Sequence, residues 1–125
     1  MKTNGMRVVW VILFAVAIIA TGVWLGVSGR PLNSALLNAH KLISLAAVIY
    51  FGFSVFQVNR ASGLKGAAPV VIIISGALLL AAIISGGMAS IDTMPDFMAL
   101  FHQISLLLAV LATGASLYLL VRSRR

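Results

Sequence analysis

The stretch LLNAHKLISL, residues 36–45, decides the fold of this chain, and it has a counterpart in MALFHQISL, residues 98–106. His40 and His102 are the chain's two histidines, and each is followed closely by an Ile-Ser-Leu triplet inside an apolar run. Ionisable side chains are costly at such depth in an apolar segment and mark functional sites by default. The two histidines are therefore the first candidates for a functional site.

The composition around these stretches is that of a membrane protein. Of 125 residues, 62% are hydrophobic, the mean hydropathy is +1.13, and only 9 basic and 2 acidic residues are present. These values exclude an ordinary soluble domain and a disordered chain. In a soluble protein the net charge of +7 would indicate nucleic-acid binding, but in this chain the cations border apolar runs. We therefore expect contacts with lipid headgroups and no nucleic-acid partner.

Four apolar runs are long enough to cross a bilayer, at about residues 8–27, 35–58, 69–88 and 96–121. Turn-forming residues separate them, such as Gly29 and Pro31 after the first run. We expect an all-α fold in which residues 1–125 form a single integral membrane domain, an up-down-up-down bundle of four transmembrane helices. A cleaved signal peptide is the competing interpretation of the first run, which is long for that purpose and lacks a good cleavage site.

The basic residues predict the orientation. With four spans, seven cations fall on one side, and Arg30 and Lys41 fall on the other; the seven are Lys2, Arg7, Arg60, Lys65, Arg122, Arg124 and Arg125. Cytoplasmic loops carry the excess of Lys and Arg. We expect both termini in the cytoplasm and the protein in a bacterial or archaeal cytoplasmic membrane.

The two halves of the chain, residues 7–60 and 69–125, resemble each other weakly. The matched positions are Thr21-Gly22 with Ser85-Gly86, Pro31 with Pro95, His40 with His102, and Ala47-Val48 with Ala109-Val110. Chance similarity between low-complexity membrane segments is the competing explanation. A true duplication would give a parallel repeat of helix pairs. Glycine-rich faces such as Gly22 and Gly26 also suit tight packing, including packing against a second copy of the chain or a partner subunit.

Two histidines at one depth predict a haem site. The second and fourth helices enter the membrane from the same side, so each imidazole lies about 8 to 10 Å below the start of its helix. Imidazoles facing each other across a bundle are the axial ligands of a low-spin b-type haem. We expect one haem b per chain, with its iron held by His40 and His102. Further candidates are Arg30 and Lys41 for the propionates, Ser44, Ser105 and Asn38 for hydrogen bonds, and Phe101 as an apolar seal.

This pattern resembles the four-helix membrane cytochromes b in architecture and ligand placement over most of the chain. The resemblance implies electron relay between quinols, reductases or partner subunits. Many of those cytochromes carry two haems on four histidines, whereas His40 and His102 can hold only one. We therefore expect a one-site relay or a subunit of a larger redox complex. An aromatic stripe on the second helix either flanks a quinone or faces lipid, and consists of Tyr50, Phe51, Phe53 and Phe56.

Two alternatives remain open. Met88, Met94 and Met98 lie on the same side as both histidines, and thioether with imidazole suits copper(I). The other alternative is a cofactor-free structural or assembly subunit, in which each imidazole donates to a neighbouring carbonyl or hydroxyl, with Ser44 or Ser105 available. Proton-coupled export and nucleophilic hydrolysis have less support, because no acidic residue lies deeper in a span than Asp96, at the start of the fourth, to exchange protons or to orient a base.

Overall fold

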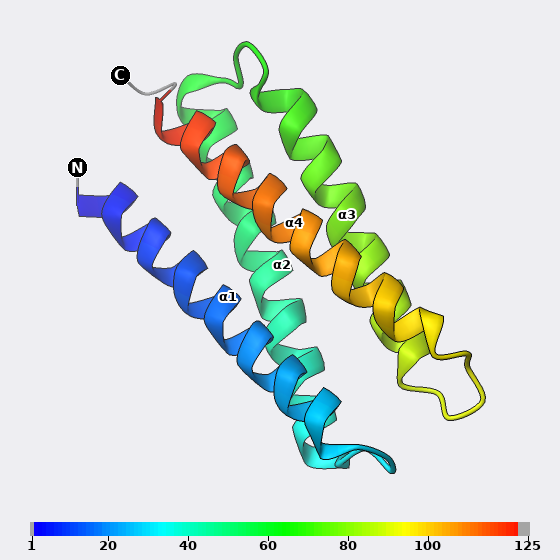
Figure 1. The fold of residues 1–125 in the computed structure, drawn as a ribbon. Coiled ribbons are helices and arrows are strands. Elements are labelled where there is room, and N and C mark those ends of the chain that lie inside the picture. The colour runs from blue at the N-terminus through cyan, green and yellow to red at the C-terminus, as the bar shows by residue number, and fades with distance from the viewer. Residues whose placement is uncertain (1, 123–125) are drawn as a thin grey trace. The chain divides into compact units, whose positions relative to one another are not determined.

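The computed structural model describes the backbone of residues 2–122 and the side chains of residues 5–122. It contains four helices (Figure 1), namely α1 (Lys2–Ser28), α2 (Ser34–Ser62), α3 (Ala68–Ala89) and α4 (Phe97–Arg122). No strand occurs in residues 2–122, so the expected all-α class with four helices is confirmed. Helix α1 begins earlier and α2 ends later than the hydropathy predicts, because helical hydrogen bonding continues into polar flanks that hydropathy cannot detect.

All four helices are long and apolar enough to span a bilayer, with candidate spans of 24, 29, 22 and 26 residues. Their outward-facing side chains are large and apolar, and Val27 and Ile73 are 79% and 71% exposed. Such surfaces are stable only against lipid or another apolar partner. The chain is therefore an integral membrane protein.

Short polar features end the helices where the sequence predicts turns. Asn33 caps α2, since its Oδ1 accepts a hydrogen bond of 3.0 Å from the backbone N–H of Leu36. At the other end of α2, Gly63 adopts a φ of 68°, and its N–H donates to the carbonyl of Asn59 at 3.0 Å. A left-handed residue at this position favours glycine, because glycine has no Cβ to clash with the backbone.

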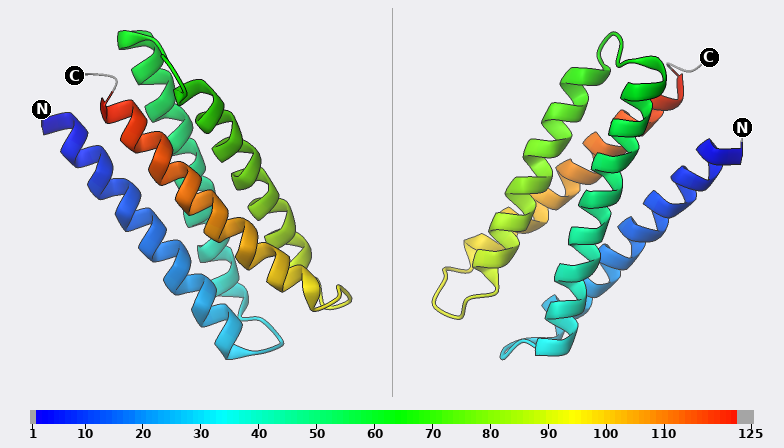
Figure 2. Two further views of the ribbon diagram at one scale, coloured as in Figure 1. Left: turned by 45° about the horizontal axis from the view of Figure 1, so that its top comes forward. Right: turned by 180° about the vertical axis from the view of Figure 1, so that it is seen from behind.

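The chain divides into two compact units, Met1–Ser54 and Val55–Arg125, with the boundary inside α2. In the first unit, α1 and the early part of α2 form an antiparallel pair, here called the first hairpin. The ring centroids of Phe14 and Tyr50 lie 5.8 Å apart across this pair. In the second unit, α3 and α4 form the second hairpin, and its two helices lie side by side in both views of Figure 2.

Small side chains form the buried face of the second hairpin. On α3 and α4 the buried residues are Ala68, Ser75, Ala82, Ser85, Ser105, Ala109, Ser116 and Leu120. Small residues let two backbones approach closely, which gives dispersion contacts that lipid cannot provide. Ser75 and Ser116 also join the helices, because their Oγ atoms lie 2.9 Å apart. Apart from Leu120, these buried side chains are small, so the hairpin is packed mainly through its small residues.

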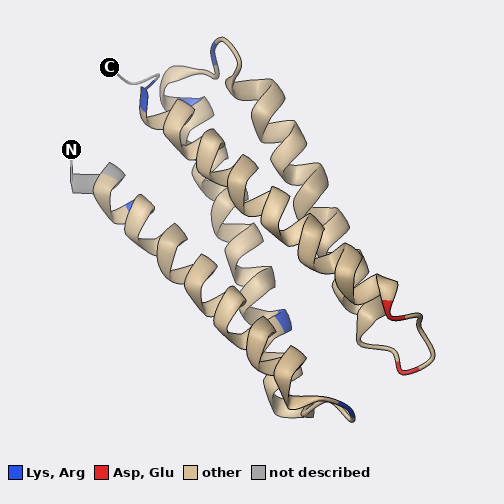
Figure 3. Ribbon diagram, in the orientation of Figure 1, with Lys and Arg blue, Asp and Glu red and all other residues tan. Residues whose placement is uncertain are grey.

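Charged residues mark the two ends of the second unit (Figure 3). Arg60, Lys65 and Arg122 lie at the end where α2 connects to α3 and where α4 terminates, whereas Asp92 and Asp96 lie in the α3–α4 connection. The basic and acidic groups therefore lie at opposite ends of the second unit. The side chain of Lys2, and Arg124 and Arg125 altogether, lie outside the described residues.

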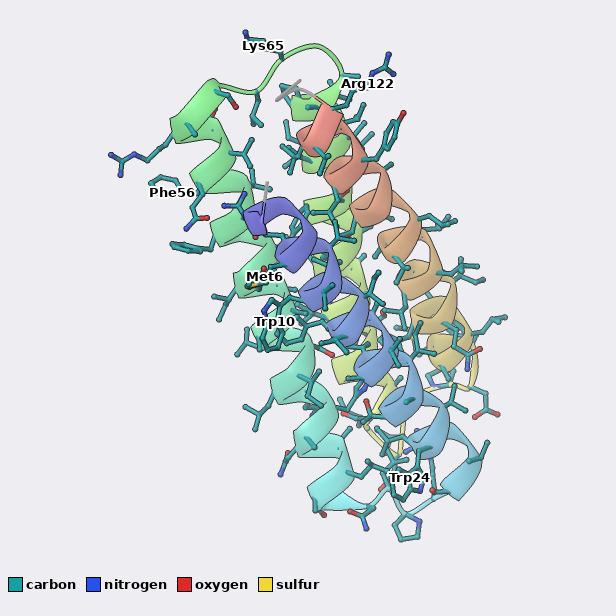
Figure 4. All side chains as sticks on the ribbon, turned by 90° about the vertical axis from the view of Figure 1, so that its left-hand side faces the viewer. Met6, Trp10, Trp24, Phe56, Lys65 and Arg122 are labelled. Carbon is teal, nitrogen blue, oxygen red and sulfur yellow. The ribbon has the colours of Figure 1, made fainter. Side chains whose placement is uncertain are left out.

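A tryptophan lies in each half of α1. Trp10 and Trp24 are 49% and 63% exposed, and Figure 4 shows Trp24 near the end of α1 and Trp10 closer to its start. Indole rings prefer the membrane interface. Their positions therefore suit a helix that spans the bilayer.

We expect the hydroxyl pair of Ser75 and Ser116 to couple the two helices of the second hairpin. Substitutions S75A, S116A and the double change should give a double-mutant cycle with a coupling of about 0.6 kcal/mol, the average for interhelical hydrogen bonds in membranes. The free energy of unfolding in mixed detergent measures it. Strictly additive single effects would show that the two hydroxyls do not interact.

Candidate functional site

His40 lies in the second turn of α2 and contacts α1 through a hydroxyl group. The Nδ1 atom of its imidazole is 2.8 Å from Oγ1 of Thr21. The Thr21 hydroxyl also lies 2.7 Å from the carbonyl oxygen of Ala17 and 3.2 Å from that of Ile18. Hydroxyl groups in membrane helices commonly make such bonds to the preceding turn, which satisfies them in hydrocarbon.

These contacts determine where the imidazole proton of His40 resides. A hydroxyl has one proton, and Thr21 donates it to the carbonyl of Ala17, which can only accept. The Thr21 oxygen therefore accepts a hydrogen bond from Nδ1–H of His40. In the neutral ring of His40, Nε2 then carries the lone pair.

His102 lies in the second turn of α4 and makes the equivalent contact with α3. Its Nδ1 is 2.8 Å from the carbonyl oxygen of Ala82 and 3.3 Å from Oγ of Ser85. The Ser85 hydroxyl donates to the carbonyl of Ala81 at 2.7 Å. Because a carbonyl has no proton to give, Nδ1 of His102 must carry one. His102 therefore has the same tautomer as His40, with the lone pair on Nε2 of the neutral ring.

A glycine makes room for each imidazole. An ideal Cβ built on Gly22 would lie 3.2 Å from Cε1 of His40, and one built on Gly86 would lie 2.8 Å from Cε1 of His102. The second distance is shorter than carbon atoms tolerate, and the first is tight. Each ring therefore lies directly against the backbone of the neighbouring helix, at a position that only glycine accommodates without a shift.

The two hairpins thus share one local design: a hydroxyl residue followed by glycine on the first helix receives the imidazole of the second. Thr21-Gly22 with His40 corresponds to Ser85-Gly86 with His102. These are the positions that the sequence comparison of the two halves aligned. The chain therefore carries two equivalent histidine positions, one in each unit.

The remaining expected site residues differ in their environment. Ser44 donates its hydroxyl proton to the backbone carbonyl of His40 at 2.8 Å, so this hydroxyl contacts the backbone of the residue that it was expected to support. Ser105 is buried on α4, whereas Asn38 is exposed. Phe101 is 51% exposed, so much of its ring faces the surroundings of the second hairpin. Arg30 and Lys41 are exposed in the first unit.

The sequence analysis did not assign Thr21, Ala82 or Ser85 to the site. Thr21 and Ser85 were singled out there only as matched positions of the internal repeat. The sequence feature that could have identified them is the hydroxyl residue followed by glycine in α1 and again in α3. Its meaning depends on which residues meet across a hairpin, and the sequence alone does not give that register.

The copper alternative, which relies on methionine sulfur beside the two histidines, stays a prediction. Among the described residues, no group of three or more His, Cys, Asp or Glu side chains is positioned to hold a metal ion. The methionines Met88, Met94 and Met98 are each partly exposed. His40 and His102 therefore stay the candidate metal ligands among the described residues.

Alanine substitution should destabilise the protein at the two glycines that contact histidine and not at glycines that have no such contact. Gly86→Ala should displace His102 and destabilise the second hairpin by about 1 to 3 kcal/mol, the usual cost of overpacking. Gly22→Ala should cost less, because its Cβ would lie farther from the imidazole. Unfolding in mixed detergent measures both effects.

Gly76→Ala on α3 and Gly26→Ala on α1 are the matched controls, because an added Cβ meets nothing within 4 Å at either position. Both controls should leave stability unchanged or raise it, since alanine favours helix over glycine. Equal effects of Gly86→Ala and Gly76→Ala would contradict the close approach of His102 to α3.

Comparison with known proteins gives no relative: no family model matches the chain, and no curated protein and no solved structure matches it.

Proposed function

We propose that this protein is a membrane b-type cytochrome that binds one haem b through His40 and His102 and relays electrons. The observation that carries the proposal is that both imidazoles donate Nδ1–H to the neighbouring helix of their own hairpin. A histidine that ligates a metal almost always donates its other ring N–H to a carbonyl or another polar group. Both histidines therefore have the tautomer that a metal ligand needs.

The donor set fits haem iron. A low-spin b-type haem takes two neutral imidazoles, and the chain supplies two Nε2 lone pairs from equivalent positions in its two hairpins. Helix bundles commonly hold such cofactors between side chains of facing helices. Arg30 and Lys41 are the cations available to offset the propionates on the extracytoplasmic side, because both lie near the start of α2. Ser105 and Phe101 are further candidates beside His102.

The protein's own groups hold the ligands and exclude water. Thr21 orients the imidazole of His40, and the carbonyl of Ala82 orients that of His102. Gly22 and Gly86, respectively, let these two rings lie against the neighbouring backbone. The surrounding apolar helices keep bulk water away, which lowers the reorganisation that accompanies a change of charge. When bound, a haem b supplies a one-electron change between ferric and ferrous iron.

If His40 and His102 both held the haem iron, no coordination position would be left for a substrate, so we propose electron transfer rather than bond-making catalysis. The excess of Lys and Arg on one side supports cytoplasmic termini and a bacterial or archaeal cytoplasmic membrane. The electron donor or acceptor would then be a quinone or a partner redox subunit that shares the bilayer.

A cofactor-free structural role is the second candidate, and the same hydrogen bonds favour it. Each imidazole joins two helices, and an interhelical hydrogen bond in a membrane contributes about 0.6 kcal/mol. In that role the histidines would join the helices and no cofactor would bind. The two candidates therefore differ in whether the purified protein takes up haem through these residues.

Histidine substitution tests the proposal. His40→Ala and His102→Ala should each abolish the sharp reduced α band while the protein still inserts in the membrane, because one remaining imidazole cannot form a bis-histidine haem. Haem content per chain and the visible spectrum of purified protein measure this. Gln103 is an exposed residue next to His102 in the chain, and the control variant Gln103→Ala should keep the full haem spectrum.

A second pair of variants guards against a trivial loss through misfolding. His40→Gly and His102→Gly leave space for free imidazole, and its addition should restore the low-spin spectrum. Full haem content in both alanine variants would exclude this ligation, and wild-type protein that takes up no haem would favour the structural role.

A further inference from the structure

The two histidine positions are equivalent in design but unequal in their hydrogen bonds. The short contact of His40 is to a side chain, since Oγ1 of Thr21 lies 2.8 Å from Nδ1. The short contact of His102 is to the backbone, since the Ala82 carbonyl lies at 2.8 Å and the Ser85 hydroxyl lies farther away at 3.3 Å. Hydrogen bonds from N–H to oxygen normally span about 2.7 to 3.2 Å, so the Ser85 contact is the weak one.

We propose that Thr21 is a positioning residue, which holds His40 in its Nδ1–H tautomer and sets the strength of this histidine as a ligand. At His102 the backbone carbonyl of Ala82 has that role, and not the Ser85 hydroxyl. The inference rests on the proposed haem ligation for its functional meaning. If it is correct, a change of the Thr21 side chain weakens haem ligation by His40. Ligation by His102 does not depend on a neighbouring side chain in the same way, because a backbone carbonyl holds this imidazole.

The chemistry of the Thr21 contact supports this role. The Thr21 hydroxyl donates to the Ala17 carbonyl at 2.7 Å, and a hydroxyl that donates becomes a better acceptor because hydrogen bonds in a chain polarise one another. A good acceptor at Nδ1–H draws electron density toward Nε2 and makes the imidazole a stronger base. A stronger base stabilises ferric iron more than ferrous iron, so Thr21 should lower the reduction potential.

The packing around His40 allows a clean chemical test. Threonine and valine have the same shape, so Thr21→Val removes the oxygen and keeps the volume beside Gly22. Ser85→Ala is the matched change in the second hairpin and leaves the Ala82 carbonyl in place. Thr21→Ser restores the hydroxyl and serves as the conservative rescue.

The first readout needs no haem. Nitrogen chemical shifts of the full-length protein, labelled with ¹⁵N-histidine and measured in detergent before haem is added, show which ring nitrogen carries the proton. Wild type should have Nδ1–H at both histidines. Thr21→Val should shift His40 toward the Nε2–H tautomer, Thr21→Ser should restore it, and Ser85→Ala should leave His102 unchanged.

The second readout uses the haem-loaded protein. Thr21→Val should weaken haem affinity by about 10-fold to 100-fold, the usual effect of losing a hydrogen-bond partner of a ligating residue. It should also raise the reduction potential and allow the ferrous protein to bind carbon monoxide, because His40 becomes exchangeable. Ser85→Ala should stay close to wild type in all three measurements.

The outcomes separate this inference from the proposed function. If Thr21→Val leaves the His40 tautomer unchanged, or if Ser85→Ala shifts His102 as strongly, the positioning role of Thr21 is overturned even when haem binds. If the tautomers respond as expected but wild type takes up no haem, the cytochrome proposal fails, and Thr21 remains the residue that positions His40 between two helices.

Discussion

The hydrogen bond from each histidine Nδ1–H to the neighbouring helix is the interaction on which the account depends. It ties α2 to α1 in the first hairpin and α4 to α3 in the second. In hydrocarbon, a polar ring without a partner would be costly, so each histidine requires an acceptor on the helix beside it. The same bond leaves the lone pair on Nε2, and the structural and ligating roles of the histidine therefore need the same geometry.

Close approach of the helices makes this bond possible. Gly22 and Gly86 remove the Cβ that would meet the imidazole, and the small residues along α3 and α4 bring the two backbones together. Serine and threonine hydroxyls at these faces donate to carbonyls of their own helices and remain able to accept. At Thr21 this accepting hydroxyl is the close partner of His40, whereas the Ser85 hydroxyl lies farther from His102 than the Ala82 carbonyl does.

The sequence was sufficient to predict the all-α fold and the four helices, because apolar runs of spanning length separated by glycine and proline have few other interpretations. It also singled out His40 and His102. It did not identify Thr21 or the Ala82 carbonyl as their partners, since a helix pattern gives the face of a residue but not the register between two helices. The backbone acceptor at Ala82 has no sequence signature at all. Common ancestry of the two halves and the up-down-up-down order stay predictions.

The central claim is that one haem is held by two imidazoles whose Nε2 atoms are the ligands. The most direct measurement is a reduced-minus-oxidised visible spectrum of wild-type protein purified in detergent after expression with haem supplied. The account predicts sharp Soret and α bands of a low-spin b-type haem, at about one haem per chain. A protein that stays colourless after haem addition would contradict it and leave the histidines as donors that hold each hairpin together.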